Sequence, residues 1–457
     1  MGIFFTFIFI LSTVFSLLQL YQVYRHNIFM KKQKIKVGTY NKIVMLVPCY
    51  NEEVVIDSAI QNFSKLKYPN LKVIFINDGS NDNTFNLLKE ILVLKEISFD
   101  QSKFGIKCNK IRGIYRSLNY PNMMVIDKEN GGKADSLNAG INLSTVDDSD
   151  FIATLDADSI LKDDALEQIN STLQNKNIIA VGGNIIASQG IQNFSGQKIK
   201  YKVPRKIVES IQFLDYLKGF FITKNSYASM KALAVISGAF GVFKKDVVLK
   251  VGGFTKSIGE DIDITIKFHR YAKKHNKKIA YNDEAICFTE VPNNWGDFFK
   301  QRIRWEKGFL DAFKNHYKFL FKNIFRDKLS FFMIFENLLL SYVSIICMII
   351  GVVYYIYDIC EDISVGNFVW IVLIIGLIIY LIYNATIFTM VHKSTLTIDK
   401  KSIIKILVLL IYDLLIFRII LIIIHIWGGI EYFFKPNSWN KVARCGANNL
   451  IKEEFNA

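Results

Sequence analysis

The stretch Ser149–Asp158, which reads SDFIATLDAD, decides the fold class. Its mainly apolar run FIATL is followed at once by two carboxylates, Asp156 and Asp158. A short continuous apolar run predicts a strand that is buried on both faces, as in parallel sheets covered by helices. Ligands of such sheets bind beyond the carboxyl ends of the strands. The stretch therefore predicts an α/β fold with a ligand site at the end of this strand.

Three earlier apolar runs have the same form. They lie in KIVMLVPCYNEE, KVIFINDGS and NMMVIDKE, and helical patterns such as VVIDSAIQNFSKL alternate with them. This alternation predicts a mostly parallel sheet. Glu52 follows the first run, Asp78 follows the second, and Lys133 lies in NGGKADSLNAG after the third. We expect these side chains at the same edge of the sheet as Asp156.

These strand ends carry the chemistry of phosphate and metal binding. Asp156 and Asp158 suit a hard divalent cation, because Mg²⁺ binds one or two carboxylates together with substrate phosphates. Lys133, next to two glycines, suits a phosphate. Each motif also has a simpler interpretation, since NDGS and NGGK are rich in turn formers and the aspartates could cap the next helix. Their joint placement favours a binding site.

The composition indicates a membrane protein. The 457 residues are 51% hydrophobic, yet the net charge is +15. Ile3–Tyr24 contains no charge and is long enough to cross a hydrocarbon core of roughly 30 Å. A signal peptide is the alternative, but no small-residue cleavage site follows. Basic residues follow from Arg25 to Lys42, which predicts that this end faces the cytoplasm.

Two further apolar stretches, Leu329–Tyr357 and Ile363–Val391, predict membrane spans. Ser402–Ile430 is ambiguous, because it contains charged side chains that lipid would penalise. It either spans the membrane or forms a re-entrant or in-plane pair, and we favour the second interpretation. The expected domains are an N-terminal membrane helix with a basic segment (1–40), a cytoplasmic α/β domain (41–310) and an interfacial helix with a membrane region (311–457).

The net charge and the cysteine and histidine content indicate which partners, disulfides and metal sites to expect. The basic excess suits a membrane surface and an anionic substrate, and we expect no nucleic acid partner. The six cysteines form no CxxC pair, and the six histidines lack metal-ligand spacing. We therefore expect reduced thiols and no zinc site.

Seven motifs together resemble the processive family-2 glycosyltransferases of the inner membrane. The bacterial poly-β-1,6-N-acetylglucosamine synthases are the most similar, and hyaluronan, chitin and cellulose synthases are relatives. The motifs occur in the family's order, with a weak Trp-containing tail, SWNKVAR, at the end. They read VPCYNEE, INDGSNDNT, ENGGKADSLNAG, LDADS, ISGAFGVFKKDVVLKVGGF, GEDIDITIKFHR and QRIRWEKG.

The resemblance implies a nucleotide-sugar domain of the GT-A type with α-helical transmembrane segments. It also implies a UDP-sugar donor, a growing polysaccharide acceptor, and Mg²⁺ or Mn²⁺ as the cofactor. On the donor side, Glu52 and Asp78 would hold the uridine and Lys133 would lie near the phosphates. Asp156 would contact both nucleotide and metal, and Asp158 would be the main metal ligand.

On the acceptor side, the resemblance implies that Asp261 in GED is the general base. Gln301, Arg304 and Trp305 match a Gln-x-x-Arg-Trp motif on an interfacial helix beside the diphosphate and the acceptor sugar. Gly259 stands where relatives have threonine, which leaves the local positioning open. Taken alone, the three motif residues would also fit an amphipathic interface helix with no catalytic part.

The expected function is polymerisation of a β-linked polysaccharide, most simply from UDP-N-acetylglucosamine, with export of the polymer. Two alternatives stay open within the family: a single transfer to a lipid such as a polyprenyl phosphate, and synthesis of another glycan such as hyaluronan or cellulose. A channel or receptor on a transferase scaffold without catalysis is a third. The family further implies a multi-pass protein of the bacterial inner membrane, with membrane lipids and a small membrane subunit as partners.

Overall fold

The computed structural model describes residues 2–32, 38–103, 105–146, 149–193, 199–335, 367–393 and 396–434. The strands are β1 (Ile43–Cys49), β2 (Leu71–Asn77), β3 (Leu94–Ile97), β4 (Ile111–Ser117), β5 (Met123–Lys128), β6 (Phe151–Leu155), β7 (Ile160–Leu161), β8 (Ile178–Ala187), β9 (Ile191–Asn193), β10 (Ile199–Tyr201), β11 (Phe240–Lys244), β12 (Lys278–Thr289) and β13 (Leu396–Ile398). The α-helices are α1 (Gly2–Lys32), α2 (Ile56–Ser64), α3 (Thr84–Leu92), α4 (Lys133–Val146), α5 (Ala165–Leu173), α6 (Ile207–Leu217), α7 (Lys224–Met230), α8 (Lys245–Lys250), α9 (Glu260–His275), α10 (Trp295–Lys322), α11 (Lys328–Phe332), α13 (Asn367–Lys393), α14 (Ser402–Tyr412) and α15 (Arg418–Phe434).

These elements form two compact units. The helical unit comprises the described residues within 1–34, 217–234 and 317–394, and the sheet unit comprises those within 35–216, 235–316 and 395–457. In this division the described segment after residue 395 belongs with the sheet.

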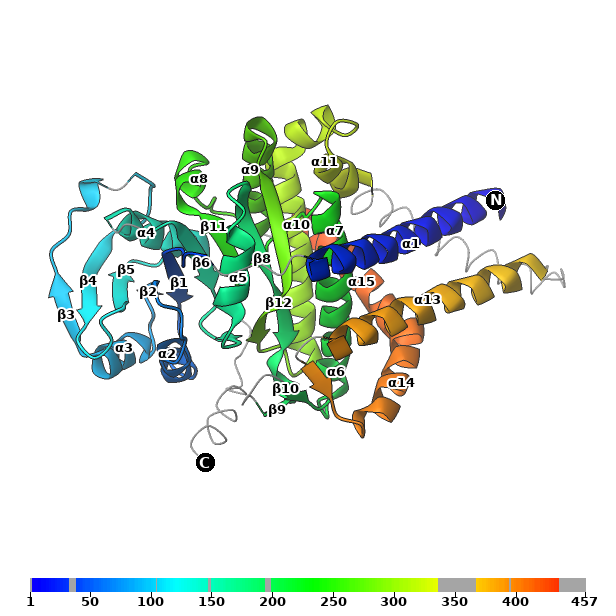
Figure 1. Ribbon diagram of the computed structural model, residues 1–457, viewed down its shortest axis with the longest axis horizontal. Helices are drawn as coiled ribbons and strands as arrows, with labels where there is room; N and C mark the ends of the chain where they lie inside the picture. The colour runs from blue at the N-terminus through cyan, green and yellow to red at the C-terminus, as the bar shows by residue number, and fades with distance from the viewer. Residues whose placement is uncertain are drawn as a thin grey trace. The chain divides into compact units, whose positions relative to one another are not determined.

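A ten-stranded sheet organises the sheet unit, in the order β3-β4-β5-β2-β1-β6-β11-β8-β12-β7 (Figure 1). The predicted strands are all present, and β1, β2, β5 and β6 run parallel to one another. All five residues of β6 are buried, as the apolar run predicts. Cys49 pairs with Asn77, which in turn pairs with Asp127, so three strands end at the same level. The polar residues that follow these strands therefore gather at one edge.

The sheet is mixed, however, and not wholly parallel. β4 pairs antiparallel with β5, β7 pairs antiparallel with β12, and β11 lies antiparallel between β6 and β8. The apolar pattern could not reveal this, because a strand buried on both faces reads the same in either direction. The insertion of β11 matters for the site, since it brings Gly238, just before that strand, beside the end of β6.

A small second sheet, in the order β13-β10-β9, belongs to the same unit. β10 pairs parallel with β13, so that residues 199–201 lie beside residues 396–398. This pairing attaches the segment that leads into α14 to the sheet unit.

In the helical unit, α1 packs against α7 and α13. An aromatic cluster connects α1, α7 and α11, with ring centroids 5.7 Å apart for both Phe15–Phe332 and Tyr227–Phe332. The predicted first membrane segment, Ile3–Tyr24, lies within α1 and is helical throughout. Among the described residues, Ile374–His392 and Ser402–Phe434 have the length and composition of a membrane span. Most of the predicted span Leu329–Tyr357 and the tail at 438–444 lie outside the described residues.

Candidate active site

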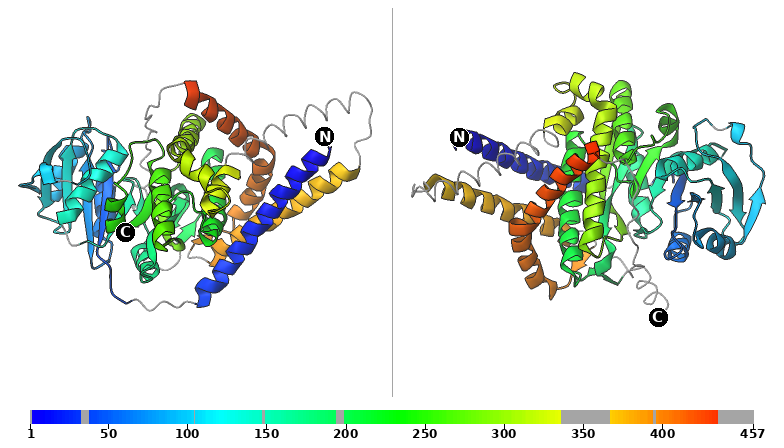
Figure 2. Two further views of the ribbon diagram at one scale, coloured as in Figure 1. Left: turned by 90° about the horizontal axis from the view of Figure 1, so that it is seen from above. Right: turned by 180° about the vertical axis from the view of Figure 1, so that it is seen from behind.

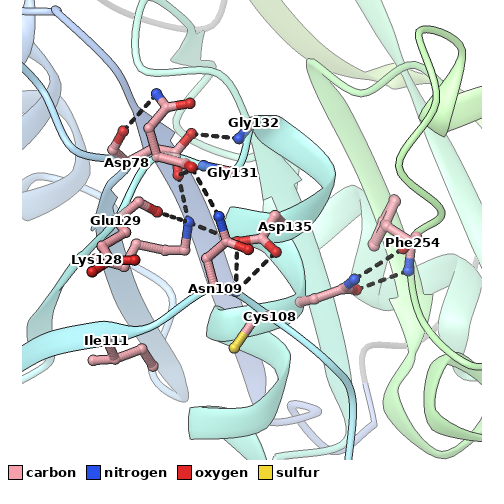
Figure 3. Close-up of polar contacts among 12 residues, drawn as sticks. Asp78, Cys108, Asn109, Ile111, Lys128, Glu129, Gly131, Gly132, Asp135 and Phe254 are labelled. Carbon is pink, nitrogen blue, oxygen red and sulfur yellow. Dashed lines mark hydrogen bonds and ion pairs between the residues drawn. The ribbon is translucent and has the colours of Figure 1, made fainter.

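Asp78, at the end of β2, holds the loop of residues 130–133. Its Oδ1 accepts hydrogen bonds from Lys128 Nζ at 2.5 Å and from the Gly131 amide at 3.0 Å, and its Oδ2 accepts one from the Gly132 amide at 2.8 Å (Figure 3). The Asp78 amide in turn donates to the Cys49 carbonyl at 2.9 Å. Asp78 therefore connects the ends of β1 and β2 to the loop that begins α4.

Lys128, the last residue of β5, is fully buried and pairs with two carboxylates. Its ammonium lies 2.5 Å from Asp78 Oδ1 and 2.7 Å from Asp135 Oδ2. A buried charge is tolerated only when it is paired and hydrogen-bonded. We name Asp78, Lys128, Gly131, Gly132 and Asp135 the Asp78 cluster. The sequence interpretation missed Lys128 and Asp135, although both lie within the run VIDKENGGKAD.

Glu52 lies at the neighbouring end of β1 and is largely buried. The Glu52 amide donates to Thr84 Oγ1 at 2.8 Å. Asn51 also joins the loops that follow β1 and β2, and its φ of 54° lies in the left-handed region. Asn51 accepts from the Asn81 amide at 2.8 Å, and its own amide donates to Ser80 Oγ at 3.0 Å. Glu52 is therefore placed beside the loop that follows Asp78.

Lys133 joins the strand ends to α9. Its ammonium lies 2.5 Å from Asp156 Oδ1, just beyond β6, and 3.8 Å from Glu260 Oε1, the first residue of α9. Burial alone would lower the pKa of Lys133, but Asp156 and Glu260 outweigh it and raise the pKa. Burial raises the pKa of Glu260 to about 7, in spite of Lys133 and with a further contribution from Asp261. The sequence interpretation gave no part to Glu260.

Asp261, the predicted base, lies next to the same lysine across Gly238. A side chain on Gly238 would place its Cβ 2.9 Å from Lys133 Nζ and 3.7 Å from the Asp261 Cβ. The Gly238 amide lies 3.4 Å from Asp261 Oδ2. The missing Cβ therefore leaves room between the lysine and the base. Gly238 belongs to the motif ISGAFGVF, which was the signal for it in the sequence.

The metal prediction rests on two carboxylates. Asp158 is 2% exposed, and Asp156 is already paired with Lys133. Within the described ranges, no group of three or more His, Cys, Asp or Glu side chains could hold a metal ion. Two carboxylates still match the donor set of Mg²⁺, which takes its remaining ligands from water and substrate phosphates. The residues therefore fit a metal that binds together with a diphosphate.

The three motif residues of α10 differ in their surroundings. Gln301 is nearly buried, whereas the Trp305 side chain is 42% exposed. The guanidinium of Arg302 lies 4.4 Å from the centre of the Trp305 ring, and its Nη2 lies 2.8 Å from Asp215 Oδ2. Arg302 occupies a variable position of the motif and was missed for that reason.

Tyr216, on α6, connects this aromatic group to the strand ends. Its ring centroid lies 6.4 Å from that of Trp305. Burial raises the pKa of Tyr216 to about 12, and the charges that act on it include Arg302, Asp158 and Arg304. Arg304 also acts on the pKa of Glu260. Arg304 thus lies within electrostatic reach of both Tyr216 and Glu260 at the start of α9.

α9 and α10 meet in a close backbone contact. A Cβ on Gly259 would lie 2.3 Å from the Gly308 carbonyl oxygen, so a side chain there would force the two helices apart. Asp263 Oδ1 lies 3.0 Å from His316 Nε2. Burial would raise the pKa of Asp263, but the His316 hydrogen bond and Lys267 outweigh it and lower the pKa to about 2. We name Gly259, Gly308, Asp263 and His316 the α9–α10 contact; it explains why Gly259 has no side chain.

The structure brings six residues of the candidate site together in two groups, and all of them except Glu260 are predicted ones. Glu52 and Asp78 lie at the ends of β1 and β2, while Lys133, Asp156, Glu260 and Asp261 converge around Gly238. Among the described residues, Cys49, Cys108 and Cys287 are free thiols.

The chain is similar to known proteins over much of its length. Residues 151–383 match the family described as glycosyl transferase family group 2, and residues 45–251 match glycosyl transferase family 2. The chain is 32% identical over 281 residues to a poly-beta-1,6-N-acetyl-D-glucosamine synthase of Staphylococcus aureus, which is 61% of this chain and 57% of that protein. It is 30% identical over 269 residues to the synthase of the same name from Staphylococcus epidermidis, covering 58% and 54%.

The chain thus spans little more than half the length of these curated relatives. Among solved structures, a mannosyltransferase from Pyrobaculum calidifontis in complex with GDP-Man and Mn²⁺ has a TM-score of 0.52 and 14% identity, covering 94% of this chain and 99% of that one. That likeness concerns the fold, which is the expected GT-A fold. With more than half of its length matched by the family, the chain belongs to glycosyltransferase family 2.

Proposed function

We propose that the protein is a membrane-embedded inverting glycosyltransferase that extends a β-linked polysaccharide from a UDP-sugar, with UDP-N-acetylglucosamine as the donor. The observation that carries the proposal is the convergence of Lys133, Asp156 and the start of α9 around Gly238. This arrangement puts a phosphate-binding cation next to a candidate base. The names of the curated relatives support N-acetylglucosamine as the sugar.

On the donor side, Glu52 and Asp78 lie at the uridine end of the site. Since the Asp78 carboxylate already accepts three hydrogen bonds, its main contribution is to hold the loop of Lys133. Lys133 and Arg304 bind the diphosphate through their charges. Asp158 and Asp156 hold Mg²⁺ or Mn²⁺, which supplies positive charge to the diphosphate leaving group.

On the acceptor side, Asp261 acts as the general base. The acceptor hydroxyl oxygen attacks the anomeric carbon from the face opposite to UDP, and Asp261 accepts the hydroxyl proton as the new bond forms. The bond between that carbon and the diphosphate oxygen breaks, UDP leaves with the electron pair, and an α-linked donor gives a β-linked product. Trp305 offers a flat ring to the acceptor sugar, and Gln301 lies four residues before it on α10.

The membrane part of the proposal rests on the apolar helices. α1 and α13 cross the inner membrane of a bacterium, the sheet unit lies in the cytoplasm, and the polymer leaves through the membrane region. The length and composition of Ile374–His392 support this arrangement. Membrane lipids and a small membrane subunit complete the proposed partners.

A donor screen on the full chain, purified with its membrane lipids, tests the proposal. With Mg²⁺ or Mn²⁺ present, we expect UDP release from UDP-N-acetylglucosamine, less from UDP-glucose or UDP-glucuronate, and a ladder of products by mass spectrometry. Asp158→Ala should lose activity together with the metal requirement, whereas Asp163→Ala, an exposed neighbour, should not. Addition of one sugar would instead indicate the lipid acceptor. No turnover of any donor would refute the proposal.

A further inference from the structure

Arg302, on α10, lies among aromatic rings. Its guanidinium carbon lies 4.4 Å from the centre of the Trp305 ring, 5.2 Å from that of Phe298 and 5.9 Å from that of Tyr216. The first two rings belong to α10 itself, and the third belongs to α6, which runs beside α10 (Figure 2). Two helices thus place three rings around one cation.

Asp215, the residue before Tyr216, supplies the counter-charge. Arg302 Nη2 lies 2.8 Å from Asp215 Oδ2, and the two side chains are only 12% and 23% exposed. Arg302 Nε is buried and has no hydrogen-bond partner among the described residues. A cation that is withdrawn from water is attracted to the negative faces of aromatic rings. The guanidinium is therefore held by one carboxylate together with the rings around it.

Trp305 differs from the other two rings in its exposure. Phe298 and Tyr216 are buried, whereas Trp305 is 42% exposed. The guanidinium of Arg302 lies over one face of the indole ring, so the exposed area of the ring lies away from Arg302. One side of Trp305 is therefore used by the protein, and the rest is available to a ligand.

The contact with Arg302 restricts the motion of the Trp305 ring. A partly exposed side chain on a helix has more than one allowed rotamer, and ordering such a side chain when a ligand binds costs free energy. A planar guanidinium stacks on a flat ring and favours the one orientation in which the two are in contact. Arg302 thus orders the ring before any ligand is bound.

We propose that Arg302 and Asp215 are positioning residues, which hold the Trp305 ring in the orientation that stacks against the acceptor sugar. This inference rests on the proposed function, in which Trp305 receives the acceptor. It adds a role for two residues that act only through Trp305. Because the chemical step and the donor do not depend on Trp305, the effect of both residues falls on acceptor binding.

Steady-state kinetics of the full chain in its membrane lipids tests this role, with a β-linked N-acetylglucosamine oligosaccharide as the acceptor. Arg302→Met removes the charge and nearly keeps the length of the side chain. We expect the acceptor KM to rise about tenfold, the size of a cation–π contact that is withdrawn from water, with little change in kcat or in the donor KM. Asp215→Asn should raise the same KM. The double variant should raise it no further than Arg302→Met alone, because both residues act through one contact.

Two further variants separate positioning from a general loss of structure. Arg302→Lys keeps the charge that pairs with Asp215 but lacks the flat surface, so it should recover part of the acceptor affinity. Lys300→Gln is the matched control, because it removes the cation of an exposed ion pair with Asp297 on the same helix and should leave all three constants unchanged. A fall in kcat or a rise in the donor KM, with an unchanged acceptor KM in Arg302→Met, would overturn the proposal.

The fluorescence of Trp305 gives a reading that does not depend on transferase activity. Its contribution is the difference in emission between a chain and the same chain with Trp305→Phe, measured without donor or acceptor. In Arg302→Met we expect acrylamide to quench this contribution more strongly and its anisotropy to fall, because the released ring is more accessible and more mobile. Asp215→Asn, which keeps the shape of its side chain, takes the place of Arg302→Met if that variant fails to fold.

The two readings fail separately. Equal quenching and equal anisotropy of Trp305 in Arg302→Met and in the unmodified chain would overturn the proposal. If the unmodified chain transfers no sugar from any donor but Arg302→Met shows the released ring, the proposed function is wrong and the orientation of Trp305 by Arg302 is supported.

Discussion

The Asp78 cluster and the α9–α10 contact both support the candidate site, but they are built differently. The Asp78 cluster draws on residues 78–135, and its two carboxylates share the Lys128 ammonium, with the Gly131 and Gly132 amides as further donors to Asp78. The α9–α10 contact joins residues 259–263 to residues 308–316, with glycine against glycine. We refer to the Asp78 cluster as the proposed donor half, and to the α9–α10 contact with the adjoining Glu260 and Asp261 as the proposed acceptor half. The difference teaches that the first depends on paired buried charges and the second on shape. Removing a charge from the first should cost stability, whereas adding a methyl group to the second should cost catalysis.

The largest expected effect belongs to the acceptor half. Asp261→Asn removes the proposed base, and we expect the rate of UDP release to fall by roughly 10²–10⁴-fold, because that is what a positioned base contributes. Donor binding, measured by calorimetry, should be retained. Asp246→Asn, an exposed aspartate on α8, is the control. If donor binding were lost together with the rate, Asp261 would belong to the donor half instead.

In the donor half, Lys128→Met leaves Asp78 and Asp135 buried without their cation. Breaking a buried ion pair on one side destabilises a protein by about 3–5 kcal/mol. We expect a correspondingly lower unfolding midpoint in detergent, whereas Lys95→Met on the exposed edge strand β3 should change little. Equal midpoints for the two variants would contradict the interpretation that this half depends on paired buried charges.

Glu260 gives the acceptor half a pH signature. Burial raises its pKa to about 7, so between about pH 4.5 and 7 the folded chain holds a proton that the unfolded chain releases. Stability should therefore fall as pH rises through this window and level off above it, by up to roughly 3 kcal/mol. Glu260→Gln should remove that slope from the unfolding midpoints. If the Glu260→Gln variant keeps the same dependence of the unfolding midpoint on pH, the proton is bound by a group other than Glu260.

The smallest expected effect is the added methyl group. Gly259→Ala puts a Cβ against the backbone of Gly308, which shifts the start of α9 and Asp261 with it. We expect kcat to fall about tenfold with little change in the KM for the donor, since small misplacements of catalytic groups are costly. Gly296→Ala is the matched control. Gly296 lies on α10, like Gly308, and a Cβ there would be 3.4 Å from its nearest atom, Asn294 Oδ1. A change in the KM for the donor with an unchanged kcat would contradict the interpretation that the shape of the α9–α10 contact positions Asp261.

The sequence alone predicted the strands and proposed most residues of the candidate site. Continuous apolar runs ending in Asn77, Asp127 or Asp156 identified buried strands, because burial on both faces leaves no polar position. Family resemblance supplied Asp261 and the α10 motif. Lys128 was missed because a lysine in a loop-like run reads as exposed; only its two carboxylate partners, brought together by adjacent strands, explain its burial.

Only the tertiary structure decided the remaining relations. The antiparallel insertion of β11, which brings Gly238 between Lys133 and Asp261, depends on strand order, and strand order is not written in the pattern of any single strand. Likewise Ser402–Phe434 reads as a membrane span by length and composition. Its attachment to the β10–α6 loop and to α10 appears only in three dimensions, because the partners of Lys405 and His425 lie more than a hundred residues away. A local pattern determines which face of a segment is apolar, and long-range contacts determine what that face meets.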